Sequence, residues 1–300
     1  MKKILVICGA TASGKTSFAV NMALRLRSEI ISADCMLIYK GFDIGTAKPT
    51  PEEKKGVPHH MIDIIEPTQN FSVSDYEHSA EPISERILSE NRVPIICGGT
   101  GFYIQSLLFR RSLGGVGSDL AVRKRYESIA ESEGKEALFA LLEKTDAETA
   151  QKLHPNDVKR VVRALEIYEL TGKKKSQQQD GFTAKRPYVA VAFDYPRDEL
   201  YRRIDQRVDS MLAEGLVDEV RGLLFRGVTQ NCQAMQGIGY KEVVEYLNGG
   251  ISYSTMSDKI KQNTRNYAKR QITLFKKFPG LLWLNPKEKN NAEKVLELIK

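Results

Sequence analysis

Short apolar runs alternate with helical segments along this chain of 300 residues. Residues 4–8, 29–32, 93–97 and 188–193 each form such a run, and residues 281–284 form a possible last one. Runs that are apolar at consecutive positions are typical of parallel strands buried on both faces. Residues 17–26 and 197–225 have helical patterns instead. The alternation predicts an α/β fold, a P-loop NTPase-like parallel sheet flanked by helices.

The segment 114–185 departs from this pattern. It opens with Gly114, Gly115 and Gly117, and it then continues with charged, helix-forming residues and no strand-like run. Asn156 or Asp157 can cap a helix that ends near Gly172. We therefore predict an all-helical insertion domain at 114–185 and a core domain formed by residues 1–113 and 186–300.

A glycine-rich turn follows the first apolar run. It matches the pattern G-x-x-x-x-G-K-[ST] between an expected strand and an expected helix, which is the context of a phosphate-binding loop. Backbone N–H groups and the helix N-terminus attract phosphate oxygens there, the lysine adds a full charge, and hydroxyls can reach Mg²⁺. We expect diphosphate binding by Gly9, Ala10, Thr11, Ala12, Ser13, Gly14, Lys15 and Thr16, with Ser13 and Thr16 as candidate Mg²⁺ ligands.

The loop alone does not predict ATP hydrolysis, although its class is nucleotide-binding and often ATP-binding. ATPases of this class hold Mg²⁺ with an acid at the end of another buried strand. The run 93–97 is instead followed by Gly98, Gly99, Thr100 and Gly101. The Thr100 hydroxyl suits contact with a leaving phosphate. A small-molecule or nucleoside kinase nevertheless remains an alternative.

Asp34 directly follows the second apolar run. Ligands of open α/β sheets bind at the carboxyl ends of strands, so Asp34 is expected to face the phosphate loop. A carboxylate there can accept a proton from a nucleophile or help to hold Mg²⁺. A purely structural role as a turn cap stays open. His59 and His60 lie in the following loop region, where a structural role is favoured over ligand contact.

Composition and charge are those of an ordinary globular chain with a mild basic surplus. The formal net charge is +7, and residues 186–300 hold 19 basic and 14 acidic residues. This balance suits a polyanionic partner without requiring one. The four cysteines show no zinc or redox spacing, which indicates a reducing cytoplasm. No apolar run is long enough for a transmembrane helix. The sequence also lacks the heptad pattern of a coiled coil, so we expect a monomer.

Eight motifs in this order resemble the tRNA dimethylallyltransferase family, also called tRNA isopentenyltransferases. The resemblance covers nearly the whole chain. The motifs are GATASGKT at 9–16, SADCMLIYKGFDIGTAKP at 32–49, HHMIDI at 59–64, GGTGFYI at 98–104, HPNDVKRVVRALEIYELTGK at 154–173, RIDQRVDSMLAEGLVDEVRGL at 203–223, GIGYKE at 237–242 and TRNYAKRQITLFKK at 264–277.

The resemblance implies a reaction. The N6 amine of the adenosine just 3′ of the anticodon (position 37) attacks the allylic carbon of dimethylallyl diphosphate, and diphosphate leaves. Asp34 would act as the base on the amine. Lys15, Thr100 and Arg221 would neutralise the leaving diphosphate, with Mg²⁺ as the cofactor.

Two positions depart from the family's pattern. Cys35 replaces the usual serine after Asp34, and Ala10 replaces the usual proline of the phosphate loop. Cys35 puts in doubt a hydroxyl contact to RNA at that position. The zinc finger of eukaryotic relatives has no counterpart here, which implies a bacterial-type enzyme.

The RNA would be a tRNA anticodon stem-loop whose target base leaves its stack. Around Asp34, we expect contacts from Cys35, Met36, Leu37 and Thr100, although a core role for Met36 and Leu37 is an equal alternative from sequence alone. The insertion would contribute Arg123, Lys159, Arg160, Val161, Val162 and Arg163. A stripe at helical spacing in the basic stretch 258–278 would track phosphates through Lys261, Arg265 and Lys269. For each of these helices, a merely solvated charged face is the competing interpretation, and a non-catalytic RNA-binding protein is the second alternative function.

Overall fold

The computed structural model describes residues 2–112, 114–178 and 181–300, and it divides into two compact units. The core unit comprises Met1–Leu108 and Ala184–Lys300, and the insertion unit comprises Phe109–Thr183. The predicted boundaries were 113/114 and 185/186, a few residues away. Leu113, the predicted end of the first core segment, lies outside the described residues.

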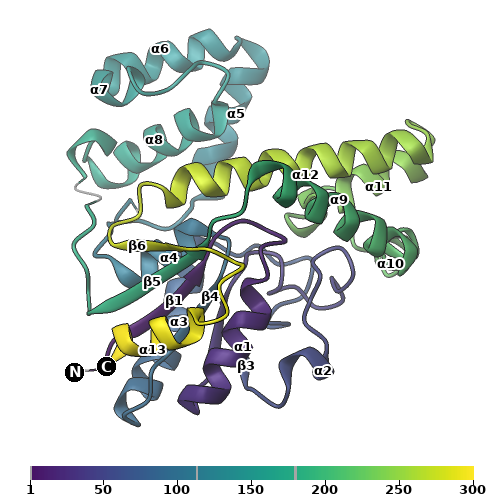
Figure 1. Cartoon of the computed structure of the whole chain (residues 1–300). Helices are drawn as coiled ribbons and strands as arrows, with labels where there is room; N and C mark the ends of the chain where they lie inside the picture. Colours follow the sequence, from purple (N-terminus) through teal and green to yellow (C-terminus); the bar gives the residue numbers. More distant parts are fainter. Residues whose placement is uncertain (1, 113, 179–180) are drawn as a thin grey trace. The chain divides into compact units, whose positions relative to one another are not determined.

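A six-stranded parallel sheet forms the centre of the core unit (Figure 1). Its spatial order is β3-β2-β4-β1-β5-β6, so the strand before the phosphate loop lies in the interior. Leu5 of β1 is in register with Ile95 of β4 on one side and with Val189 of β5 on the other. The strands are β1 (Ile4–Cys8), β2 (Ile30–Ala33), β3 (His59–His60), β4 (Ile95–Gly98), β5 (Tyr188–Phe193) and β6 (Leu281–Leu284).

Helices flank this sheet, as the hydrophobic pattern predicts. One helical layer packs Ala19, Met22 and Val295 against Leu5 and Ile7 of β1. The core unit's helices are α1 (Lys15–Leu26), α2 (Pro51–Lys54), α3 (Val73–Ser89), α4 (Gly101–Leu108), α9 (Arg197–Ala213), α10 (Leu216–Phe225), α11 (Tyr240–Leu247), α12 (Tyr253–Phe275) and α13 (Asn291–Ile299), with the 3₁₀ turn η2 (Ala234–Gln236). In the described residues, no helix has both the length and the apolarity to cross a membrane.

Two features of the core differ from the prediction. Residues 197–225 form two helices, because the chain turns at Gly215, which has a φ of 102°. A positive φ of this kind strongly favours glycine. The pair His59–His60 forms the edge strand β3, which the apolar pattern did not reveal since both residues are polar.

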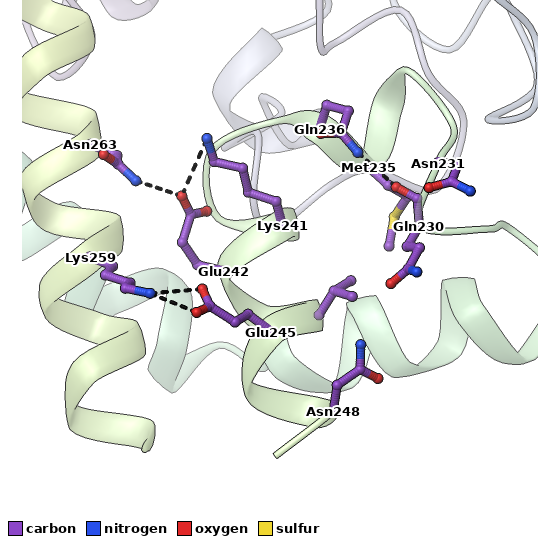
Figure 2. Close-up of a pocket in the computed structure, with 11 residues that line it drawn as sticks. Gln230, Asn231, Met235, Gln236, Lys241, Glu242, Glu245, Asn248, Lys259 and Asn263 are labelled. Carbon is purple, nitrogen blue, oxygen red and sulfur yellow. Dashed lines mark hydrogen bonds and ion pairs between the residues drawn. The ribbon is translucent and has the colours of Figure 1, made fainter. Parts of the chain in front are cut away.

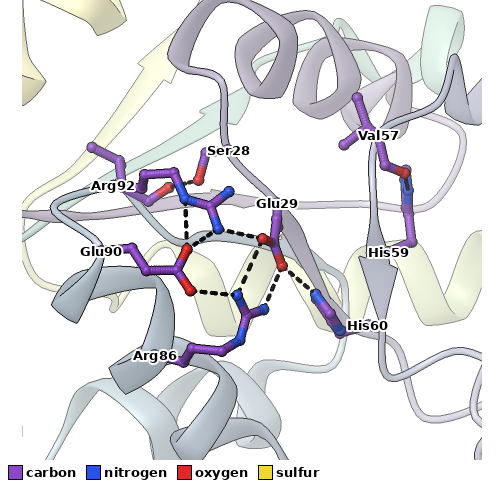
Figure 3. A network of polar contacts seen from close by, with 9 residues as sticks. Ser28, Glu29, Val57, His59, His60, Arg86, Glu90 and Arg92 are labelled. Carbon is purple, nitrogen blue, oxygen red and sulfur yellow. Dashed lines mark hydrogen bonds and ion pairs between the residues drawn. The ribbon is translucent and has the colours of Figure 1, made fainter.

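A polar cluster holds the amino end of β2 (Figure 3). The carboxylate of Glu29 is largely buried and accepts hydrogen bonds from Arg86 at 2.5 Å and Arg92 at 2.5 Å, and it lies 2.6 Å from His60 Nε2. Hydrogen bonds from Arg86, outweighing burial, lower the pKa of Glu29 to about 2, with help from His60 and Arg92. His60 therefore has the structural role that the sequence favoured.

The insertion unit is all helical, as predicted. Its elements are α5 (Leu120–Ser132), α6 (Lys135–Thr145), α7 (Ala147–Ala150), α8 (Val158–Thr171) and the 3₁₀ turn η1 (Lys175–Gln177). Asp157 is the N-cap residue of α8, and Gly172 ends the helix in the left-handed conformation. Leu138 and Leu142 of α6 pack with Leu165 of α8 to form a separate small core.

Candidate active site

A cavity of about 450 Å³ lies at the carboxyl ends of β1 and β2 in the core unit. Thr11 and Lys15 of the phosphate loop line it together with Asp34. The structure therefore brings the loop and the carboxylate to one cavity, as the strand-end argument predicts. The remaining walls come from α9, the loop before α11, and α12.

The phosphate loop curls tightly before α1. Gly14 is the N-cap residue of α1 and has a φ of 80°, while Ala12 is also left-handed, with a φ of 61°. The Nζ of Lys15 donates a hydrogen bond to the carbonyl of Ala10 at 3.2 Å, which folds the side chain back over the loop. Burial lowers the pKa of the Lys15 ammonium. A desolvated cation of this kind gains strongly from an incoming anion.

Gln271 of α12 ties the phosphate loop to the end of β4. Its Oε1 accepts a hydrogen bond from the Thr11 amide at 2.9 Å, and its Nε2 donates to the Gly99 carbonyl at 3.0 Å. An added Cβ at position 99 would lie 2.1 Å from that Nε2, so a larger residue there would displace the Gln271 amide from the Gly99 carbonyl. On the other side, Arg203 Nε donates to the carbonyl of Ala12 at 2.8 Å. The loop conformation is thus held by two late helices that sequence patterns did not connect to it.

The Asp34 carboxylate sits at the start of a turn after β2. Its Oδ1 accepts a hydrogen bond from the Met36 amide at 2.9 Å, so the predicted capping role and the predicted place in the site coexist. The Thr100 hydroxyl accepts from the Cys35 amide at 3.0 Å, which fixes the same turn against the end of β4. Burial, followed by the charge of Asp34, raises the pKa of the Cys35 thiol to about 11. Cys35 therefore remains a neutral thiol near neutral pH.

Arg207 of α9 is a cation of this cavity that the sequence analysis missed. It lines the cavity, and burial lowers its pKa while the charge of Asp34 opposes that shift. A signal was present, since Arg207 lies at helical spacing from Ile204 and Met211, which line the same cavity. A charged residue inside an apolar stripe indicates a functional position.

Arg221, the predicted arginine of the site, lies elsewhere. It is on α10, its side chain is 60% exposed, and it forms an ion pair with Asp218 one turn away. The buried face of α10 is formed by Leu216, Val220 and Leu223. The structure gives Arg221 no place beside Lys15 and Asp34, because it is on the opposite side of its helix from that face.

Much of the remaining cavity wall is apolar. The side chains come from the turn after β2, from α9 and α12, and from the loop before α11: Met36, Tyr39, Ile204, Val208, Met211, Ile238 and Ile260. Met36 lines the cavity and also packs against the adjacent core, so its core role is seen here, while its contact with RNA stays a prediction. Leu37 is half-buried, and its carbonyl accepts a hydrogen bond from the Asp63 amide at 3.0 Å.

The two predicted Mg²⁺ ligands have different surroundings. Thr16 follows Lys15 and is exposed, so its hydroxyl fits a hard cation that the phosphates of a ligand also hold. The hydroxyl of Ser13 is buried without a hydrogen-bond partner in the described structure, and Ser13 lines a different, smaller cavity of about 250 Å³. Among the described residues, no group of three His, Cys, Asp or Glu side chains could hold a metal ion. Thr16 therefore fits the predicted role better than Ser13.

The basic stripe on α12 is partly neutralised. Lys261 forms an ion pair with Asp209 at 2.6 Å, and Arg265 forms one with Asp205 at 2.6 Å. Both acids belong to α9, so these contacts join the two helices. Lys269 is exposed. Of the three predicted phosphate contacts, Lys269 keeps its charge accessible, whereas Lys261 and Arg265 are engaged within the protein.

In the insertion unit, part of the predicted RNA surface is structural. Val161 and Val162 are 0% and 2% exposed and belong to the small core, so the predicted RNA contact at these positions would have to use the backbone. Arg123 and Arg163 bind the fully buried Glu166 at 2.9 Å and 2.6 Å. Helical periodicity placed the two arginines on helices, but it could not reveal that the buried Glu166 is their partner.

Two exposed cations of α8 remain candidates for RNA contact. Lys159 and Arg160 are both exposed, and Arg160 makes only a surface ion pair with Asp157 at 3.3 Å. Such a pair contributes little to stability and exchanges readily for a phosphate.

Comparisons with known proteins agree with this geometry. Residues 37–278 match a family model described as IPP transferase, and residues 2–68 match one described as isopentenyl transferase. The chain belongs to the IPP transferase family. A relative named tRNA dimethylallyltransferase from Pelotomaculum thermopropionicum is 44% identical over 298 residues, covering 99% of this chain and 95% of the relative. A relative of the same name from Geobacillus thermodenitrificans is 45% identical over 286 residues, with 95% and 90% covered.

Solved structures of the IPP transferase family have the same fold. The tRNA isopentenylpyrophosphate transferase of Bacillus halodurans superposes with a TM-score of 0.73 at 41% identity, covering 99% of this chain and 94% of that one. A eukaryotic dimethylallyltransferase described as acting on tRNA gives a TM-score of 0.83 at 29% identity, with 99% and 78% covered. The P-loop NTPase-like fold and the family predicted from the sequence are thereby confirmed.

Proposed function

We propose that the chain transfers a dimethylallyl group from dimethylallyl diphosphate to N6 of the adenosine at position 37, next to the anticodon of tRNA. The proposal depends mainly on one cavity, whose lining combines Lys15, Arg207 and Asp34 with apolar side chains. Two partly buried cations suit a diphosphate, and the apolar side chains suit a five-carbon prenyl group. The family membership agrees with this chemistry.

The reaction needs four changes that balance. The N6–carbon bond forms, the allylic carbon–oxygen bond breaks, the amine loses a proton, and diphosphate leaves. Asp34 is the base that takes the proton, since its Oδ1 is held by the Met36 amide and the carboxylate lines the cavity. Lys15 and Arg207 neutralise the leaving diphosphate, and each such preorganised charge contributes about 3 kcal/mol to the rate.

The protein's main contribution is positioning and leaving-group stabilisation, because an exocyclic amine is a weak nucleophile. Thr100 acts here by holding the turn that carries Asp34 and Cys35. Magnesium, held by the donor's phosphates and the Thr16 hydroxyl, would add positive charge to the leaving group. We propose that the reaction takes place in the cytoplasm, since all four cysteines are free thiols, and that the protein acts as a monomer.

An incubation with labelled donors tests the function. Purified protein is mixed with labelled dimethylallyl diphosphate or with labelled ATP, each with and without an anticodon stem-loop RNA. We expect label in RNA from the prenyl donor alone. ATP consumption without RNA labelling would contradict the proposal and favour the alternative of a P-loop small-molecule kinase.

A further inference from the structure

A second cavity of about 600 Å³ opens on the core unit beside the active site (Figure 2). It lies among the loop after α10, the turn η2, α11 and α12. None of the motifs assigned above to the reaction needs it. Its lining residues are Gln230, Asn231, Met235, Gln236, Lys241, Glu242, Val244, Glu245, Asn248, Lys259 and Asn263.

The lining is unusually rich in carboxamides, which make up five of its eleven residues. A carboxamide offers both donors and an acceptor, so it can pair with the edge of a nucleobase through two hydrogen bonds. Gln236 donates to the Gln230 carbonyl at 2.8 Å. In the described chain, the exposed side-chain amides of Gln230, Asn231 and Asn248 hydrogen-bond to no other residue, and Figure 2 draws them without a dashed contact.

The charged side chains of the cavity largely neutralise one another. Lys259 binds Glu245 at 2.7 and 2.9 Å, and the buried Glu242 accepts from Asn263 at 2.7 Å and from the Gly239 amide at 2.8 Å. These contacts make the cavity a poor site for a phosphate or a metal ion. A neutral ligand with both donors and acceptors fits it better.

Two apolar side chains also line the cavity. Met235 and Val244 are 1% and 7% exposed and line it beside the amides. A polarisable thioether and a branched aliphatic side chain both pack well against an aromatic face. Proteins hold splayed RNA bases by stacking them on planar groups and by hydrogen bonds to their edges, and the amides of this cavity can supply the hydrogen bonds.

The two cavities share a wall. Gln236 and Lys241 line both the amide-rich cavity and the cavity that contains Lys15 and Asp34. A ligand that occupies both cavities must be extended and must place one ring in each cavity. Successive nucleotides of a single-stranded loop meet this requirement.

We propose that the amide-rich cavity receives the base of a nucleotide adjacent to the target adenosine and reads that base through Gln230, Asn231 and Asn248. This inference rests on the proposed function, because it places the target base beside Asp34. Lys241, which is 48% exposed and 3.7 Å from Glu242, can meet the phosphate between the two nucleotides. The site would make transfer depend on the identity of a neighbouring base.

A double-mutant cycle between protein and RNA tests this. The protein arm is the Gln230→Ala/Asn231→Ala double variant, and Asn248→Ala is a second, independent arm. The RNA arm is an anticodon stem-loop with an abasic residue 5′ or 3′ of the target adenosine. The measurement is the KM and kcat for RNA and the KM for dimethylallyl diphosphate, and the control is Gln262→Ala, an exposed amide of α12 outside the cavity lining.

With intact RNA, we expect roughly a tenfold or larger rise in the KM for RNA in each arm, since a good bidentate contact discriminates by about this factor. On RNA that is abasic at the position read, the same variants should change KM less than threefold. Equal losses on intact and abasic RNA at both positions, an effect on the donor KM alone, or no loss would overturn the inference. If wild-type protein labels no RNA at all, the proposed function fails instead.

Discussion

Two carboxylates stand at the two ends of strand β2 and have opposite surroundings. Glu29, just before the strand, is bound by Arg86, Arg92 and His60. Asp34, just after it, is held by one backbone amide and lines a cavity with Lys15. The acid at the amino end is already fully paired by the protein, whereas the acid at the carboxyl end leaves capacity for a ligand. Both residues are acids, so the type of residue does not explain the difference. The carboxylate at the carboxyl end of the strand lies where ligands of parallel sheets bind, whereas the one at the amino end has a structural role.

The sharpest way to break this comparison is to change Asp34. Asp34→Asn keeps the side chain's shape and its Oδ1 acceptor, so the turn to Met36 should survive. Prenyl transfer should nevertheless fall by about 10³-fold, because a positioned general base contributes 10²- to 10⁴-fold. Single-turnover kinetics with labelled donor measures the loss, and unchanged RNA binding is the control. Transfer within tenfold of wild type would remove Asp34 as the base.

Alanine variants of Arg207 and Arg221 test which of the two arginines neutralises the leaving diphosphate. Arg207→Ala should lower kcat/KM by about a hundredfold, since it removes one cation beside the diphosphate. Arg221→Ala should change it by less than threefold, because Arg221 is exposed and paired with Asp218. Steady-state kinetics on both variants decides between the structural and the sequence-based assignment, and the reverse order of effects would restore Arg221.

Glu29 should matter for stability instead. Glu29→Gln should reduce the free energy of unfolding by about 2 kcal/mol, because it weakens the charge-assisted hydrogen bonds from the partly exposed Arg86 and Arg92 to a buried carboxylate. Glu90→Gln is the control, since Glu90 also contacts Arg86 and Arg92 but is exposed, and it should cost about 1 kcal/mol or less. Urea unfolding measures both variants. Transfer by folded Glu29→Gln protein should stay near the wild-type value, and a large loss there would erase the contrast with Asp34.

The same acid predicts a pH dependence. The pKa of Glu29 is lowered from 4.5 to about 2 in the folded protein. Its stabilising contribution is therefore fully present above pH 4.5 and is lost as the pH falls towards 2. Urea midpoints measured from pH 5 to pH 2 should fall more steeply for wild type than for Glu29→Gln. Parallel curves would show that this carboxylate does not carry the effect.

The smallest effect is expected at Cys35. Cys35→Ser should change transfer by less than about fivefold, because the turn uses the backbone amide of residue 35, which donates to Thr100. The KM for RNA is the informative quantity, since a hydroxyl could add a contact that a neutral thiol lacks. A hundredfold change in kcat would instead place this side chain in the chemistry.

The sequence predicted the parts of the site that are local in the chain. The phosphate loop, the strand before it and Asp34 at a strand end each follow from a few neighbouring residues. The insertion unit and its helix from Val158 to Thr171 were also visible, because capping residues and periodicity mark helix ends.

The site residues that the sequence analysis did not predict are those whose position depends on how a helix packs against a loop. Arg207 and Gln271 lie far along the chain from the phosphate loop, and only packing brings them to it. The intramolecular partners of Val161 and Arg163 were missed for the same reason, since helical spacing does not reveal the core beside Val161 or the buried Glu166. Polar strand β3 lacked an apolar run altogether.

The bridge from Gln271 to Thr11 and Gly99 has a consequence for biosynthesis. A ribosome makes the phosphate loop within the first sixteen residues, but the side chain that braces it arrives about 260 residues later. A nascent chain released before α12 would carry the whole signature motif and still lack a finished diphosphate cradle. The phosphate loop near the start of the chain therefore reaches its observed conformation only after α12 has been synthesised, because Gln271 is one of the side chains that hold it.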